Sequence, residues 1–345
     1  MAAPTGDSRI LQIHPLKQCN LRCLHCYSES APQGRERLPV DLLLRALPQA
    51  RAAGYGVVSI SGGEPLLYEP LPELLAGCAN AGLAATVTTN GMLLDERRVG
   101  WLADRTLLVA ISLDGRPESH NLMRGSPRAF QEMERRLPLL RDAGIAFGFI
   151  FTLTQYNLDE LQWVAEFAAG QGAGLLQIHP LEPIGRARAE LADSAPDPYE
   201  LSAAFLESLR LQTLAGDGMV VHFDALPREA LTERPEQFFA QPEPGADLPF
   251  AEILSPLVIE SDGTVSPVDH GFARHFALGD LKTAELQDLM EAWRETKLDD
   301  FHQLCRSAWL DLSRPAEWPF VNWYAELNQR ADRWADRPHP ASAAV

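Results

Sequence analysis

Three cysteines lie close together near the start of the chain. Cys19, Cys23 and Cys26 follow the spacing C-x3-C-x2-C. Thiolate sulfur is a soft ligand that suits zinc and iron–sulfur clusters. A cluster of about four irons takes four ligands, so three thiolates leave one iron open to an exchangeable ligand. An open position is typical of a metal site that does chemistry. The alternative is a structural zinc site completed by His25.

A second motif, Ser61-Gly62-Gly63-Glu64-Pro65, follows an apolar run that is typical of a strand. Two glycines let the backbone approach a ligand closely, and Pro65 biases Glu64 toward an extended conformation. Taken alone, a Gly-Gly pair after a strand more often marks a simple turn. Its functional interpretation therefore depends on the nearby cysteines.

Small polar residues also close the next two predicted strands, at Thr88–Gly91 and Ser112–Gly115. Barrel enzymes place their sites at the carboxyl ends of strands. Asn-Gly and Asp-Gly are everyday turn dipeptides too, so each motif is weak by itself. Further along, Arg124 precedes Gly125. It is a candidate for a bidentate contact with a carboxylate, or else a solvated side chain before a turn.

The elements that must position these residues follow an alternating pattern. Short apolar runs alternate with helical patterns at roughly 30-residue spacing, which predicts β–α units around a parallel sheet. Helices are expected at Arg128–Ala143, which ends before Gly144, and at Asp159–Ala169. Six units are fewer than the eight of a closed barrel, so we expect a partial (β/α)6 barrel of the α/β class. Its strands are predicted at Ile10–His14, Val57–Ser61, Ala84–Thr89, Leu107–Leu113, Ala146–Leu153 and Gly174–His179.

Composition narrows the possible partners and location. The 345 residues carry a formal net charge of −17, which argues against a nucleic-acid partner. The sequence holds no apolar run of about 18 residues, so no membrane span is expected. Residues Met1–Arg9 lack the apolar stretch of a secretory signal. Five cysteines, three of them clustered, favour a metal site in a reducing cytoplasm over a disulfide framework.

These motifs together resemble the radical S-adenosylmethionine (radical SAM) superfamily over about residues 9–185. The resemblance implies one 4Fe-4S cluster, held by Cys19, Cys23 and Cys26, whose unique iron binds S-adenosylmethionine (SAM). An electron from the reduced cluster then cleaves SAM to a 5′-deoxyadenosyl radical. An electron donor such as a flavodoxin or ferredoxin is implied as partner. The residues that the resemblance assigns to SAM binding are Tyr27, Gly62, Gly63, Glu64, Asn90, Ser112, Asp114 and Arg124.

The C-terminal part resembles the SPASM (cofactor- and peptide-maturing) extension of one subgroup. We expect a connecting helical segment at 186–250, a SPASM-like domain at 251–337 with a β-hairpin plus helices, and a disordered tail at 338–345. Its hairpin is predicted from Leu257–Glu260 and Thr264–Val268, and a helix from Glu285–Lys297. The cysteines that serve auxiliary clusters in that family are missing, because Val268 follows Pro267. The domain is therefore expected to be degenerate.

Cys305 is the remaining thiol of this region. It is a candidate catalytic hydrogen-atom donor, because S–H is a weak bond, or else a buried inert thiol. A different metal site, made by Asp269, His270, His275 and Cys305, is a further possibility. Without an auxiliary cluster to accept a second electron, we expect a redox-neutral reaction.

Candidate substrate contacts stand at the ends of the fifth and sixth strands. They are Thr152, Gln177 and His179, with Thr154 and Glu182 beside them, although a lone His at a strand end is often structural. The turn Gly185-Arg186-Ala187 resembles one that seats SAM or substrate in the subgroup.

The expected function is modification of a peptide or peptide-derived cofactor precursor. About nine residues precede the first strand, too few for a leader-binding domain, so a separate carrier protein is expected. One alternative is action on a small metabolite such as a nucleoside, sugar or porphyrinoid intermediate. Another is a non-catalytic protein that binds the cluster or SAM.

Overall fold

Six parallel strands form the centre of the chain, and their predicted bounds are right to within one residue at each end. The computed structural model describes residues 9–233, 235, 248–314, 316 and 319–334, so the predicted tail at 338–345 lies outside the described residues. Each strand pairs in parallel with the next one along the chain. The strands are β1 (Ile10–Ile13), β2 (Val57–Ile60), β3 (Ala84–Thr89), β4 (Leu108–Ser112), β5 (Phe147–Leu153) and β6 (Leu175–Pro180).

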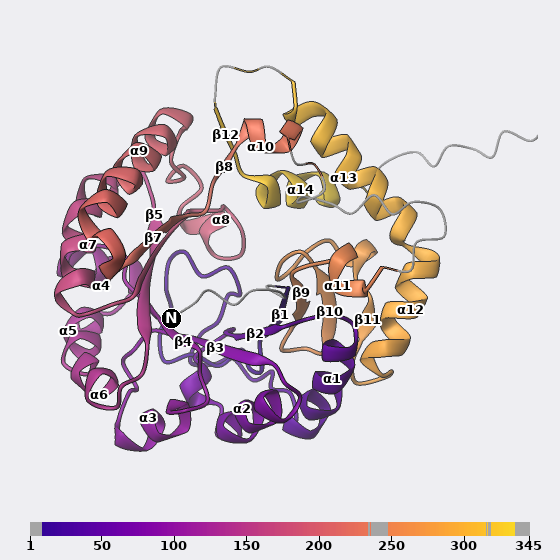
Figure 1. Cartoon of the computed structure of the whole chain (residues 1–345), viewed down its shortest axis with the longest axis horizontal. Helices are drawn as coiled ribbons and strands as arrows, with labels where there is room; N and C mark the ends of the chain where they lie inside the picture. The colour runs from indigo at the N-terminus through magenta and orange to yellow at the C-terminus, as the bar shows by residue number, and fades with distance from the viewer. Residues whose placement is uncertain (1–8, 234, 236–247, 315, 317–318, 335–345) are drawn as a thin grey trace, which may run out of the picture.

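Helices cover the outer face of this curved sheet, and loops fill its inner side (Figure 1). The hydrophobic core lies between the two layers, where strand residues such as Val58 and Phe149 and helix residues such as Leu43 are fully buried. Burial of apolar faces in this way is what stabilises β–α units. The covering helices are α1 (Val40–Ala52), α2 (Leu71–Asn80), α3 (Glu96–Leu102), α4 (Pro117–Arg124), α5 (Ala129–Glu134), α6 (Leu137–Asp142) and α7 (Leu161–Gly170).

The single helix predicted at Arg128–Ala143 is wrong, because the structure divides it into α5 and α6. Pro138 lies in the first turn of α6. Proline lacks an N–H and its ring crowds the carbonyl four residues earlier, so the helix restarts around it. Pro48, in contrast, is accommodated inside α1.

The sheet continues beyond the predicted barrel at both edges. Within the predicted connecting segment, β7 (Val220–Phe223) pairs in parallel with β6. At the other edge β9 (Leu257–Ile259) pairs in parallel with β1 and, as predicted, forms a hairpin with β10 (Thr264–Pro267). With β11 (Gly279–Asp280), the described sheet has the order β11-β10-β9-β1-β2-β3-β4-β5-β6-β7.

Further helices close the ring opposite the barrel strands (Figure 1). The predicted helix at Glu285–Lys297 is present as α12. None of the helices in the described part of the chain combines the length and apolar character needed to cross a membrane. The remaining elements are α8 (Ala187–Glu190), α9 (Pro198–Ala215), β8 (Leu226–Pro227), α10 (Arg228–Glu233), α11 (Phe250–Ile253), α12 (Leu286–Thr296), α13 (Leu298–Leu312), β12 (Phe320–Val321) and α14 (Trp323–Asp332).

Candidate active site

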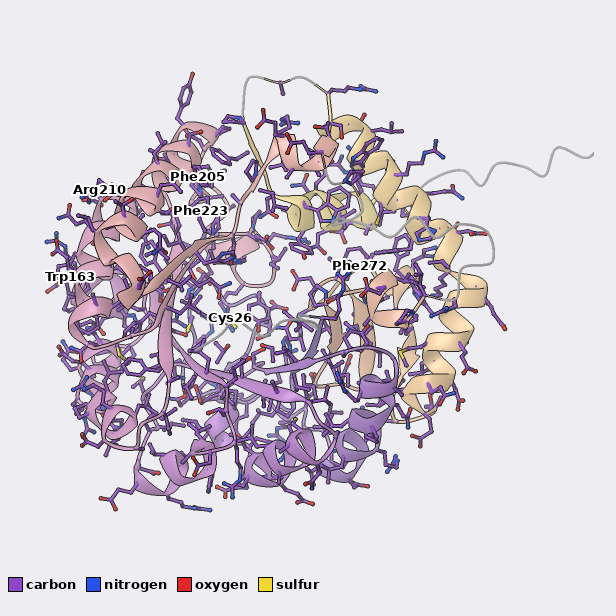
Figure 2. The ribbon with its side chains drawn as sticks, in the orientation of Figure 1. Cys26, Trp163, Phe205, Arg210, Phe223 and Phe272 are labelled. Carbon is purple, nitrogen blue, oxygen red and sulfur yellow. The ribbon has the colours of Figure 1, made fainter. Side chains whose placement is uncertain are left out.

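The cysteine motif lies on the long connection between β1 and α1, residues 14–39, which we call the cysteine loop. Cys19 and Cys23 are buried, Cys26 is partly buried, and all three are free thiols. They gather with Leu21 and Met92 in a small cluster apart from the main core. Figure 2 shows Cys26 near the middle of the molecule, inside the curved sheet. The fold therefore brings the three thiols together at the centre of the barrel.

Three glycines allow neighbouring segments to touch the backbone of this loop. A Cβ on Gly63 would lie 2.1 Å from the Gln18 carbonyl oxygen, and one on Gly185 would lie 2.2 Å from that of Tyr27. At Gly125, with φ of +64°, the distance to the Arg22 oxygen would be 2.8 Å. Only glycine fits such approaches. Gly63 thus has a packing role against the cysteine loop that sequence reasoning missed.

Arg186 also holds the cysteine loop. Its guanidinium donates to the carbonyl oxygens of Cys23, at 2.6 Å, and Ser30, at 2.9 Å. Its backbone N–H donates to the Cys26 carbonyl at 3.0 Å. These contacts occupy a buried side chain that the sequence pattern linked with seating SAM or substrate. In the structure it fixes the shape of the loop.

Each of the three sulfurs has a nitrogen donor nearby. The Leu21 N–H lies 3.4 Å from Cys19 Sγ, the Ser30 N–H 3.3 Å from Cys26 Sγ, and Arg124 Nη1 3.7 Å from Cys23 Sγ. Such donors stabilise the negative charge of thiolates that ligate iron. The residues present therefore fit a cluster held by three cysteines.

The zinc alternative finds less support in the geometry. Among the described residues, no group of three or more His, Cys, Asp or Glu side chains is arranged to hold a single metal ion. The His25 ring lies beside Asp114, with Nε2 3.8 Å from Oδ1. Burial lowers the pKa of His25 to about 4, so this ring is neutral near pH 7.

Burial raises the pKa of the Cys19 thiol, and the nearby Glu64 carboxylate adds to the effect. Burial likewise raises the pKa of Cys23. Both thiols therefore carry protons in the metal-free chain, and metal ligation has to displace them.

Glu64 links the ends of β2 and β3. Its carboxylate, 1% exposed, accepts hydrogen bonds from Thr89 Oγ1 at 2.7 Å and from the N–H groups of Leu66 and Asn90, both at 3.0 Å. Asn90 in turn donates to Asn20 of the cysteine loop at 2.8 Å. The predicted contact of Glu64 with SAM stays a prediction. Its observed contacts tie two strand ends to the loop.

Asp114 and Arg124 form a buried ion pair after β4. Arg124 Nε lies 2.6 Å from Asp114 Oδ2, and Arg124 Nη2 donates to Oδ1 at 3.2 Å. His25 and His120 flank the same carboxylate. Despite burial, the Arg124 charge holds the pKa of Asp114 below its usual range, so the pair is ionised. The guanidinium of Arg124, predicted to contact the SAM carboxylate, here pairs with Asp114.

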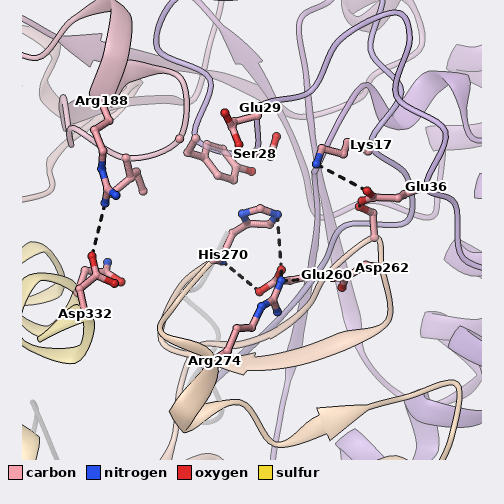
Figure 3. Close-up of a pocket in the computed structure, with 16 residues that line it drawn as sticks. Lys17, Ser28, Glu29, Glu36, Arg188, Glu260, Asp262, His270, Arg274 and Asp332 are labelled. Carbon is pink, nitrogen blue, oxygen red and sulfur yellow. Dashed lines mark hydrogen bonds and ion pairs between the residues drawn. The ribbon is translucent and has the colours of Figure 1, made fainter. Parts of the chain in front are cut away.

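The remaining predicted SAM contacts are Tyr27, Ser112 and Gly62. The Tyr27 hydroxyl is 3.3 Å from Ser61 Oγ and 3.4 Å from His14 Nε2. Tyr27 also lines a polar cavity of about 510 Å³ between the cysteine loop and the C-terminal hairpin, which Figure 3 shows. Ser112 is buried at the end of β4, and Gly62, with φ of +102°, turns the chain after β2.

The predicted substrate residue His179 has a partner that sequence reasoning missed. Its Nδ1 lies 3.0 Å from Asp224 Oδ2, and Gln177 donates to the same oxygen at 2.7 Å. Asp224 follows β7, which the sequence pattern did not reveal. Burial opposes the imidazolium, yet Asp224 raises the pKa of His179 to about 9. The His179 side chain is 43% exposed. Thr152 is buried on β5 beside it.

The possible C-terminal metal ligands do not gather. Cys305 is 1% exposed in the main hydrophobic core, where burial raises its pKa. His275 pairs with Asp300 at 3.2 Å, and Asp269 accepts from Asn328. The metal site suggested for Asp269, His270, His275 and Cys305 is therefore absent from the described residues. The hydrogen-donor role of Cys305 stays a prediction.

Comparisons with known proteins agree with this geometry. A family model described as the radical SAM superfamily matches residues 13–168. The AdoMet-dependent heme synthase of Methanosarcina barkeri (strain Fusaro) is 31% identical over 205 residues, 58% of each chain. The sporulation killing factor maturation protein SkfB of Bacillus subtilis is 28% identical over 170 residues, 49% of this chain and 42% of SkfB. The chain thus spans about half the length of these curated relatives.

The structure of native anSMEcpe with bound AdoMet and Cp18Cys peptide has a similar fold. Its TM-score is 0.63 at 19% identity, and the match covers 95% of this chain and 96% of that chain. At this identity the likeness concerns the fold alone. The family match includes Cys19, Cys23 and Cys26, the three thiols that the fold gathers. Over residues 13–168 the chain carries a domain of the radical SAM superfamily.

Proposed function

We propose that the chain is an enzyme that cleaves SAM reductively at one 4Fe-4S cluster and modifies a peptide or peptide-derived precursor. The observation that carries this proposal is the gathering of Cys19, Cys23 and Cys26 on one anchored loop, each sulfur beside a nitrogen donor. When bound, the cluster and SAM would supply a 5′-deoxyadenosyl radical that abstracts hydrogen from the substrate.

The residues of this chain then hold and shield the reactants. The three cysteines would ligate the cluster, and Arg186 keeps their loop in shape. Tyr27, Gly62, Gly63, Glu64, Asn90 and Ser112 would surround SAM at the strand ends. The C-terminal helices close the ring opposite these strands and would limit the access of water (Figure 1).

The substrate class has two supported candidates. A peptide is favoured because the fold match with peptide-bound anSMEcpe covers nearly the whole chain, and because SkfB is a maturation protein. A porphyrinoid is the second candidate, because a heme synthase is 31% identical over more than half of the chain. A carrier protein, a flavodoxin or ferredoxin as electron donor, and a cytoplasmic location stay predictions.

Anaerobic reconstitution tests the core of the proposal. The full chain should bind roughly four irons and, with dithionite as reductant, convert SAM to 5′-deoxyadenosine and methionine. Iron near eight per chain would contradict the single cluster. Absence of 5′-deoxyadenosine from a fully loaded protein would contradict the proposed activity.

The substrate class is tested with the two candidate substrates. Short peptides encoded beside the gene and iron porphyrinoids are each incubated with the loaded enzyme and SAM. Faster formation of 5′-deoxyadenosine with a peptide, together with a changed peptide mass, supports the first candidate. Stimulation by a porphyrinoid alone would replace it with the second.

The redox-neutral outcome is tested in deuterium oxide. Because no auxiliary cluster is expected to take up a second electron, hydrogen should return to the product. Deuterium in the product that is lost in Cys305→Ala would support the thiol as donor. Unlabelled product formed with catalytic SAM would support return from 5′-deoxyadenosine. A product two electrons more oxidised than the substrate would contradict a neutral outcome.

A further inference from the structure

We propose that Arg124, positioned by Asp114, donates a hydrogen bond to the sulfur of Cys23 and thereby sets the reduction potential of the cluster. This inference rests on the proposed function, because it needs a cluster on the cysteine loop. It gives Arg124 a role other than the contact with the SAM carboxylate predicted from the sequence.

The nitrogens of the Arg124 guanidinium contact two different partners. Nη2 donates to Asp114 Oδ1 at 3.2 Å, and Nε lies 2.6 Å from Oδ2 of the same carboxylate as an ion pair. The third, Nη1, is 3.7 Å from Cys23 Sγ. A planar fork held on one side by a carboxylate has a fixed direction on its other side. That direction is toward the sulfur.

Neighbouring residues hold the Asp114–Arg124 pair in place. Asp114 is fully buried and Arg124 is 8% exposed. The Asp114 N–H donates to His120 Nδ1 at 3.2 Å, and its carbonyl accepts from Asn157 at 3.1 Å. On the other side, the Met123 carbonyl accepts the Leu24 N–H of the cysteine loop at 2.9 Å. These contacts therefore tie the segment that carries Arg124 to the cysteine loop that carries the Cys23 sulfur.

Electrostatics predicts the direction in which each residue shifts the reduction potential of the cluster. Charges and hydrogen bonds near the sulfurs set the potential of an iron–sulfur cluster. A donor on a positive group favours the reduced state, which carries one more negative charge, and so raises the potential. Asp114 lies on the far side of the guanidinium and partly cancels it. The two residues therefore act in opposite directions, with Arg124 the nearer and stronger.

Potentiometric titration followed by electron paramagnetic resonance tests this on the reconstituted full chain without SAM. The variants are Arg124→Gln, Asp114→Asn and the double variant. The control is Arg22→Gln, because Arg22 is next to Cys23 in sequence but is 60% exposed and 4.0 Å from Glu190. It removes the same charge where solvent screens it. The double variant leaves no unpaired buried charge, so it keeps the test valid if a single variant misfolds.

The expected potentials fall in a definite order. Asp114→Asn should lie above the wild type, the double variant below it, and Arg124→Gln lowest, with a smaller shift in Arg22→Gln than in Arg124→Gln. Equal potentials in loaded wild type and all variants would overturn the inference. So would weaker SAM binding in Arg124→Gln at an unchanged potential, since that outcome assigns Arg124 to SAM. A wild type that binds no cluster would instead overturn the proposed function, and this inference with it.

Discussion

The surroundings of the cysteine loop and the C-terminal hairpin each include a buried carboxylate surrounded by donors, yet the two networks end at different groups. Beside the loop, Asp114 pairs with Arg124, which reaches the sulfur of Cys23. At the hairpin, Glu260 accepts from Ser266 Oγ and from Arg274, whose side chain is 54% exposed (Figure 3). One network ends at a thiol and the other at solvent.

The thiols themselves also differ between the two regions. The three on the cysteine loop lie on irregular backbone, where backbone N–H groups donate to two of the sulfurs and Arg124 donates to the third. Cys305 lies on the buried face of α13, where apolar side chains surround it. Burial in a helix packs a thiol well but gives it no second ligand.

Val268 follows the strand β10 of the C-terminal hairpin. Its backbone φ is +67°, a left-handed conformation that is unfavourable for a β-branched residue. Its N–H donates to the Pro256 carbonyl at 3.0 Å, and its side chain is buried. The turn after β10 therefore keeps its conformation although valine is a poor residue for it.

The largest expected effect is the loss of bound iron when the thiols of the cysteine loop, rather than Cys305, are removed. Replacing Cys19, Cys23 and Cys26 together by Ala should reduce bound iron from about four per chain to none, because no other thiol group is gathered. Cys305→Ala should leave iron unchanged. Iron and sulfide analysis with absorbance spectra measures both. A brown chromophore that survives in the triple variant would contradict the assignment of the site.

The next effect is a loss of stability on replacing Gly63, which contacts the cysteine loop, compared with Gly271 in the C-terminal part. Gly63→Ala places a Cβ 2.1 Å from the Gln18 carbonyl, so the free energy of unfolding should fall by more than about 4 kcal/mol. Gly271→Ala meets nothing within 4 Å and has φ of +76°, so it should cost only about 1 kcal/mol. Urea denaturation of the metal-free chains compares them. Equal losses would mean that the loop yields to the added carbon.

A smaller effect on SAM affinity is expected to distinguish the buried glutamates Glu64 and Glu260. If Glu64 receives the ammonium group of SAM, Glu64→Ala should weaken SAM binding by about 1.5–3 kcal/mol, the scale of a charge-assisted hydrogen bond. Its iron content should not change, because Glu64 is not a ligand. Glu260→Ala, the matched loss in the hairpin, should leave SAM affinity unaltered. Calorimetry on the loaded proteins decides, and equal affinities in both variants would leave Glu64 with its structural contacts alone.

The smallest effect concerns two histidines. Asp224 raises the pKa of His179 to about 9, whereas burial lowers the pKa of His270. In Asp224→Asn, nuclear magnetic resonance should show the pKa of His179 falling toward 6.5, with His270 unchanged. A pKa that stays near 9 would assign the shift to other groups.

The same pair predicts a pH dependence of stability. A raised pKa means that the ion pair stabilises the fold fully below about pH 6.5 and loses this as pH rises through 9. The difference in unfolding free energy between wild type and Asp224→Asn should shrink over that interval. Asp224 also raises the pKa of His222, so the comparison is repeated in the His222→Gln background, which removes that second contribution.

The sequence by itself determined the positions of the six central strands and the presence of a clustered thiol motif. Apolar periodicity depends on neighbours a few residues apart, so the six strands could be predicted within one residue at each end. The thiol spacing is also local, and it predicted a metal site without any structure. Apolar periodicity alone did not predict the division of the helix near Pro138, because the apolar pattern continues across the break between α5 and α6.

Only the tertiary structure decided which partners the charged residues have. Asp224 meets His179 because β7 pairs with β6, and β7 has no strong pattern of its own. Arg186 is 163 residues from the Cys23 carbonyl that it holds. With 47 acidic residues to choose from, no spacing could single out Asp114 as the partner of Arg124. Long-range pairing is set by how strand ends and loops converge, which local sequence does not encode.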